Sequence, residues 1–190
     1  IGGACGYGED KGIFGFGYSP NTAVTNLVSN TGVIATDTTG VGTARFAMGA
    51  CEYGGDKGIF GYGSGLTAVT NLVSNVGVVA TDTTGVGTAR SALAACGYGY
   101  DKGIFGFGNA GSVTAVTNLV SNAGVVASDV TGVGTARQGL AACEYGGDKG
   151  IFGYGSGLST TNLVSNAGVV GTDVTGVGTA RASLAACSFN

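Results

Sequence analysis

The chain lacks histidine and tryptophan, and it has one proline (Pro20) and one methionine among 190 residues. Without histidine, a Ser-His-Asp triad and histidine acid or base catalysis are excluded. Charged residues make up 10% of the sequence, the net charge is −3, and no basic run exists, so the electrostatic footprint of nucleic-acid binding is missing. The longest uncharged stretches are full of Gly, Asn, Ser and Thr, so we expect no membrane span. No signal peptide is visible, and the start at Ile1 suggests a processed or trimmed product.

Glycine is abundant, with 40 copies, and the apolar fraction is 44%. A disordered tract would be poor in Val, Ile and Leu, and collagen would carry glycine at every third position. We therefore expect glycine in tight turns and at close backbone contacts of a folded chain.

An internal repeat organises the whole chain, and its clearest marker is one cysteine per repeat, 44 to 47 residues apart. All variation in length falls in one segment of each repeat, as expected for a loop on a fixed scaffold. We predict a single repeat domain over residues 1–190, with repeats at about 5–50, 51–95, 96–142 and 143–187. The cysteines are Cys5, Cys51, Cys96, Cys143 and Cys187.

Each repeat contains four strand candidates. In the third repeat they are Leu93–Tyr98, Lys102–Gly108, Thr117–Ser121 and Val125–Asp129, which we call A, B, C and D. Helix formers show no 3.6-residue period. We predict an all-β fold of four tandem four-stranded repeats, either a small four-bladed β-propeller or part of a larger propeller or stack.

Alternation in strand B suggests how repeats stack. Phe105 and Phe107 are predicted on one face, with Ile104, Gly106 and Gly108 on the other. We expect the rings of one repeat to lie in the glycine recesses of the next.

The order AR…LAAC, DKGIFGYG, TNLVSN, turn, VVATD and GTAR resembles the kelch repeat of β-propellers. The repeat is also similar to those of tail-fibre proteins of marine phages. The first resemblance implies a propeller with partner-binding loops. The second implies an extracellular or virion-surface location.

One strand is in excess, because five copies of strand A accompany four B–C–D triplets. The C-terminal copy (Leu184–Phe189) would complete the first repeat, leaving residues 1–8 spare. Alternatively, the spare strand adds to a neighbouring molecule, giving a homo-oligomer, or the chain belongs to a longer array or open stack.

Every Lys, Arg and Asp recurs in register, which is typical of structural residues, so we expect no enzyme. We interpret the Asp–Arg pairs as ion pairs or backbone anchors that fix each repeat, with sugar binding as the alternative. The cysteines are interpreted as buried small residues. No cofactor or metal site is predicted. The pairs, eight residues apart, are Asp37/Arg45, Asp82/Arg90, Asp129/Arg137 and Asp173/Arg181.

We expect a binding or adhesion module that recognises a glycan or a surface protein through its variable B–C loops. A self-assembling fibre, spike or filament subunit is the alternative. The loops are Tyr18–Ala23, Ser64–Ala68, Asn109–Ala115 and Ser156–Ser159, and the candidate binding residues are Tyr18, Asn21, Ser64, Asn109, Ser112 and Ser156.

Overall fold

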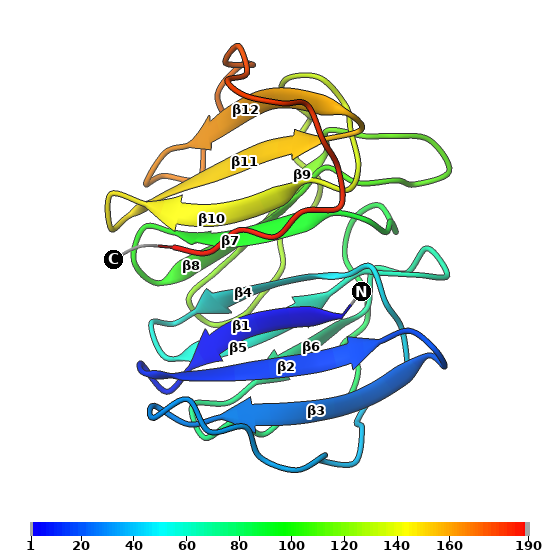
Figure 1. The fold of residues 1–190 in the computed structure, drawn as a ribbon, viewed down its shortest axis with the longest axis vertical. Coiled ribbons are helices and arrows are strands. Elements are labelled where there is room, and N and C mark those ends of the chain that lie inside the picture. The colour runs from blue at the N-terminus through cyan, green and yellow to red at the C-terminus, as the bar shows by residue number, and fades with distance from the viewer. Residues whose placement is uncertain (1, 189–190) are drawn as a thin grey trace.

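The computed structural model describes residues 2–188, which contain strands, turns and irregular segments but no helix. The prediction of an all-β chain is confirmed for these residues. Twelve strands form four separate three-stranded antiparallel sheets, one for each repeat (Figure 1). The strands are β1 (Gly3–Tyr7), β2 (Lys11–Gly17), β3 (Thr22–Val28), β4 (Gly49–Tyr53), β5 (Lys57–Gly61), β6 (Thr70–Val73), β7 (Ala94–Tyr98), β8 (Lys102–Gly106), β9 (Thr117–Val120), β10 (Ala141–Tyr145), β11 (Lys149–Gly155) and β12 (Leu158–Val164).

Each sheet is built on the same A–B hairpin, in which a cysteine of strand A pairs with the isoleucine of strand B. Cys51 lies opposite Ile59, and the other sheets keep this register. The turn between β4 and β5 contains Gly54 and Gly55 with φ of 65° and 77°. Glycine adopts this left-handed conformation without a steric penalty, which explains its place in the turn.

The prediction that segment D forms a regular fourth strand in each repeat is wrong. Segment D of the third repeat is joined to β9 by one isolated bridge at Val126, and a second isolated bridge follows the segment at Val130. Between these bridges, Asn118 Nδ2 donates to the Ala127 carbonyl at 3.0 Å. A side chain therefore takes the place of a backbone partner, so the ladder does not continue along the segment.

The four sheets succeed one another in chain order, and their inner strands β1, β4, β7 and β10 lie next to each other. The first sheet lies at one end of the long axis of the molecule and the fourth at the other (Figure 1). The hydrophobic core consists of three clusters, one between each pair of successive sheets. The fold is therefore held together by three repeated junctions.

The two aromatic residues of strand B face different neighbours, so the prediction that they share a face is wrong. The Phe105 ring lies against Gly61 of the preceding sheet. The Phe107 ring packs edge-on against Phe152 of the following sheet, with 5.2 Å between centroids. Phe107 has φ of 63°, and its equivalents in the other repeats have φ of 61° to 63°. This left-handed residue interrupts the alternation and turns the second ring to the opposite face.

The first copy of strand A is β1, which pairs with β2 along its whole length. The C-terminal copy forms no ladder in the described residues, so it does not complete the first sheet. Its last member, Phe189, lies outside the described residues, as does Ile1 of the spare N-terminal segment. The Ser183 amide donates to the Gly139 carbonyl at 2.8 Å, which repeats the link from Ala92 to Ala47. Farther along the segment, Ser188 Oγ accepts from the Glu144 amide of β10 at 3.1 Å, so the C-terminal copy runs beside that strand.

Candidate functional site

A buried arginine ties each sheet to the next. Arg45 precedes β4 and is 1% exposed. Its guanidinium carbon lies 4.5 Å from the centroid of the Phe16 ring in the first sheet. Its Nε donates to the Tyr62 carbonyl at 2.8 Å, and its Nη2 donates to Asn71 Oδ1 at 2.7 Å, both in the second sheet. Tyr62, whose carbonyl accepts this hydrogen bond from the arginine, is thus the residue with the left-handed backbone conformation.

A carboxylate completes this arrangement. Asp82 Oδ1 lies 4.0 Å from Arg45 Nη1, and it accepts a hydrogen bond from Asn71 Nδ2 at 2.9 Å. The Thr43 hydroxyl donates to Asp82 Oδ2 at 2.6 Å. Burial lowers the pKa of Arg45, although the charge of Asp82 opposes that change. Burial alone would raise the pKa of Asp82, but the hydrogen bonds from Thr43 and Asn71 lower it.

We call this set of arginine, stacked ring, carbonyl, asparagine, aspartate and threonine the arginine junction. It recurs twice. Arg90 lies 4.2 Å from the Tyr62 ring and donates to the Phe107 carbonyl at 2.8 Å. Arg137 lies 4.3 Å from the Phe107 ring and donates to the Tyr154 carbonyl at 2.7 Å. In these two further junctions, the buried arginine Nη2 and the asparagine Oδ1 do not form the hydrogen bond that joins Arg45 to Asn71.

The predicted pairing of these charges is wrong. Arg45 lies beside Asp82, not beside Asp37, which is eight residues before it in the sequence. The threonine that precedes the next arginine by two residues, Thr88, binds Asp129 in the same way. Asp82, Asp129 and Asp173 therefore each belong to the junction before their own sheet, because the arginine segment crosses from one sheet to the next.

The B–C loops lie along one edge of the array, beside the residues that follow each arginine. Ser64 Oγ accepts from the Phe46 amide at 3.1 Å. Ser156 Oγ accepts from the Gln138 amide at 3.0 Å, and Asn109 Nδ2 donates to Gln138 Oε1 at 2.8 Å. The side chains of these three candidate residues therefore form hydrogen bonds to other residues of the same chain.

The other three candidate residues are exposed. The Tyr18 side chain is 68% exposed, and its ring centroid lies 4.9 Å from that of Phe46. Asn21 and Ser112 are exposed at the tips of their loops. The structure thus separates the six predicted residues into an anchoring group and an exposed group.

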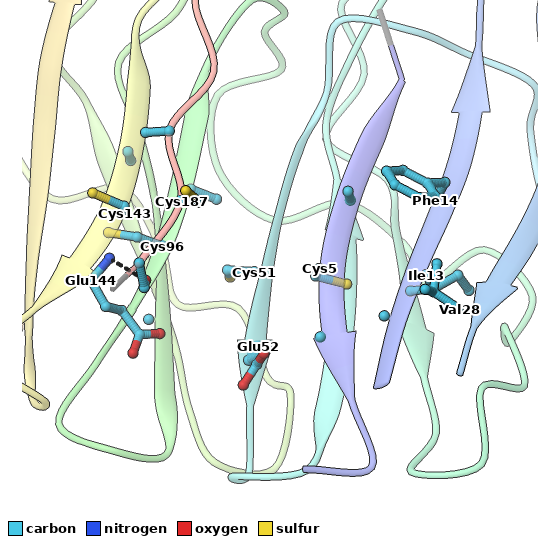
Figure 2. A pocket seen from close by; sticks show the side chains of 18 residues that line it. Cys5, Ile13, Phe14, Val28, Cys51, Glu52, Cys96, Cys143, Glu144 and Cys187 are labelled. Carbon is cyan, nitrogen blue, oxygen red and sulfur yellow. Dashed lines mark hydrogen bonds between the residues drawn. The ribbon is translucent and has the colours of Figure 1, made fainter. Parts of the chain in front are cut away.

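The inner strands enclose a groove of about 480 Å³ that contains the five cysteines and two glutamates (Figure 2). All five cysteines are free thiols. Cys5, Cys51 and Cys96 each place Sγ against a strand B glycine of the following sheet. Figure 2 shows Glu52 and Glu144 toward one end of the groove.

Three thiols of the groove are poorly suited to nucleophilic chemistry. Burial raises the pKa of Cys5 to about 12 and raises those of Cys51 and Cys96 as well. A thiol with a raised pKa stays protonated at neutral pH, and the protonated form is a poor nucleophile. Burial also raises the pKa of Glu52 and of Glu144, and the charge of Glu144 adds to the effect at Glu52.

In residues 2–188, no three acidic, cysteine or histidine side chains lie close enough together to hold a metal ion. That part of the chain also contains no helix of the length and apolar character needed to cross a membrane. No family model matches the chain, and no curated protein matches it.

The sequence alone did not lead us to name the asparagine of the arginine junction as a candidate residue. Asn71, Asn118 and Asn162 are fully buried, and each binds an aspartate side chain. The signal was present, because every repeat has asparagine at this place in the motif TNLVSN. A polar residue within an otherwise apolar strand needs a buried hydrogen-bond partner.

Proposed function

We propose that the four sheets are successive blades of a β-propeller and that the array is a non-enzymatic binding module. The support for a propeller is the regular succession of inner strands, the repetition of the arginine junction and the resemblance to kelch repeats. The proposed location of the module is a virion surface or the outside of a cell, because the repeat resembles those of phage tail-fibre proteins.

The observation that carries the binding proposal is the exposed Tyr18 ring packed on Phe46 at the loop edge. An aromatic ring offers an apolar face, and the hydroxyl of tyrosine adds a polar group, a combination that suits ligands with both characters. A sugar ring is such a ligand, since it presents C–H groups on its faces and hydroxyl groups around its edge. Asn21, exposed in the same loop, supplies an amide for those hydroxyl groups.

Rigid anchoring of the loop bases supports the same proposal. The Gly63 amide donates to the Arg90 carbonyl at 2.9 Å, and Gly108 and Gly155 bind Arg137 and Arg181 in the same way. A loop held at its base loses less conformational freedom when its tip binds a ligand.

The test is glycan-array binding of the full chain followed by affinity measurement on the best glycan. Tyr18→Ala should weaken that affinity by about fivefold to tenfold, the value of one aromatic contact. Tyr100→Ala is the matched control, because Tyr100 is also highly exposed but lies in an A–B turn at the other end of the strands. Equal affinity of the two variants, or no binding to any glycan, would refute the proposal.

A further inference from the structure

The residue that follows each arginine varies together with the B–C loop beside it. The base of each loop binds the carbonyl of one arginine, and after the longer loops of the first and third repeats the next residue is Phe46 or Gln138. After the short loops of the second and fourth repeats it is Ser91 or Ala182. A large side chain therefore occurs at this position only where the adjacent loop is long, which indicates a role that it shares with the loop.

In the first repeat, this residue supports an exposed aromatic ring. The ring centroids of Tyr18 and Phe46 are 4.9 Å apart, with an angle of 57° between the ring planes. Phe46 is half-buried, and its backbone is held on both sides by Ser64, whose Oγ accepts from the Phe46 amide and whose amide donates to the Phe46 carbonyl at 2.7 Å. The exposed ring of Tyr18 thus lies against an anchored support, so it loses little conformational freedom when it binds a ligand.

In the third repeat, the corresponding residue presents an oriented amide. Asn109 Nδ2 donates to Gln138 Oε1 at 2.8 Å, and Asn109 Oδ1 accepts from the Gly111 amide at 2.8 Å. The Gln138 amide is held by Ser156 Oγ at 3.0 Å. Within residues 2–188, Gln138 Nε2 forms no hydrogen bond, so its two N–H groups remain for a ligand.

Both pairs lie on a surface built from neutral groups. The four B–C loops and the four residues after the arginines contain no charged side chain. The arginines beside the two pairs, Arg45 and Arg137, are 1% and 0% exposed, and Arg45 already has a carboxylate at 4.0 Å, that of Asp82. An anionic group brought to this edge would lose water without gaining an accessible charged partner, which costs free energy.

We propose that the glycan recognised at the loop edge is uncharged, and that Phe46 and Gln138, which lie outside the loops, determine its recognition. The ring of Tyr18, positioned by Phe46, packs on the C–H face of one sugar. The Gln138 amide, oriented by Asn109, donates to a hydroxyl oxygen or to the carbonyl oxygen of an N-acetyl group. This inference rests on the proposed function and adds to it the class of glycan and a second subsite.

The first test compares each neutral glycan on an array with its sialylated, sulfated or uronic acid counterpart. The neutral form should bind at least about tenfold more tightly, because the acidic form must lose water around its charge. Equal or tighter binding of the acidic forms, still weakened by Tyr18→Ala, would overturn this inference and leave the proposed function standing. No binding to any glycan would overturn both.

The second test concerns the amide subsite. Gln138→Ala should weaken the affinity for the best neutral glycan by about threefold to tenfold, which is the effect of one lost hydrogen bond. Ser91→Ala is the matched control, because Ser91 follows its arginine at the same position and its hydrogen bonds to Asn109 use the backbone. Equal affinity of these two variants would exclude Gln138 from the site.

The third test separates positioning of the Tyr18 ring from a general effect on folding. Phe46→Ala should weaken binding by about as much as Tyr18→Ala, that is, about fivefold to tenfold, and it should have no further effect when combined with Tyr18→Ala. Phe46→Tyr keeps a supporting ring and should restore the affinity. Circular dichroism confirms that each variant is folded. Independent, multiplicative losses in the double variant, or no rescue by Phe46→Tyr, would overturn the positioning role.

Discussion

A substitution of one glycine by alanine tests the packing between sheets most directly. In Gly106→Ala, the new Cβ would lie 2.6 Å from Cζ of Phe152, whereas van der Waals contact begins near 3.4 Å. The phenyl ring is fully buried and rigid, so it would have to move by most of an ångström. Overpacking of this kind costs about 1–3 kcal/mol, and alanine in a strand returns about 0.5–1 kcal/mol of conformational free energy. We expect a net loss of about 1–2 kcal/mol in the free energy of unfolding.

The fourth sheet provides the control for that substitution. Gly153 has the same position in strand B, but an added Cβ there would meet only Thr161 at 3.5 Å. Gly153→Ala should therefore leave stability unchanged or raise it by up to about 1 kcal/mol. Urea unfolding, followed by far-ultraviolet circular dichroism at low protein concentration, gives both values. If Gly106→Ala were as stable as Gly153→Ala, the ring would not lie in the recess and the junction would be misassigned.

Three further outcomes follow from the same contacts. Arg45→Ala should lower the free energy of unfolding by about 2–4 kcal/mol, because it leaves the Tyr62 carbonyl and the buried Asn71 Oδ1 without their hydrogen-bond donor. Arg181→Ala should cost under about 1 kcal/mol, because that side chain is exposed; equal losses in urea unfolding would contradict the difference. Burial raises the pKa of Glu52 in the folded state, so its stabilising effect is complete below its unfolded pKa and is lost as the pH rises through the folded value. Glu52→Gln should accordingly raise the free energy of unfolding at pH 7 but not at pH 4, and a gain at pH 4 alone would reverse the assignment. Iodoacetamide should label exposed Cys187 first in the native chain and all five cysteines in denaturant without reductant, as followed by intact mass; a species with blocked thiols would show a disulfide.

The number of sheets and the order of their strands could be predicted from the repeat, because fixed spacings and short alternating segments determine hairpins locally. The A–B hairpin is the best example, since its glycine turn and its Cys–Ile register recur in all four repeats. Segment D could not be predicted correctly. Its composition is that of a strand, but the amide of Asn118 binds its backbone, and this competition is visible only in three dimensions.

The aspartate partners of the arginines could not be predicted from the sequence either. Residues eight apart in a β-rich chain need not meet, because the chain crosses from one sheet to the next between them. The constant spacing of Asp37 and Arg45 reflects the length of that crossing segment and carries no information about contact. Likewise, the left-handed conformation of Phe107 could not be predicted, because the rest of its motif follows the regular alternation of a strand.

The junction also explains how the loops can differ while the rest of the repeat stays fixed. Arg90 donates to the carbonyl of Phe107 at the base of the third sheet's loop, and its own carbonyl accepts from the amide of Gly63 at the base of the second sheet's loop. These bonds use backbone atoms at the base of the loop, so they do not depend on the loop's length or composition. Tyr18 in the first loop contacts the Phe46 ring but takes no part in these hydrogen bonds. A change of residues at the tip leaves the contacts between sheets intact, which is the separation that a binding module with exchangeable specificity requires.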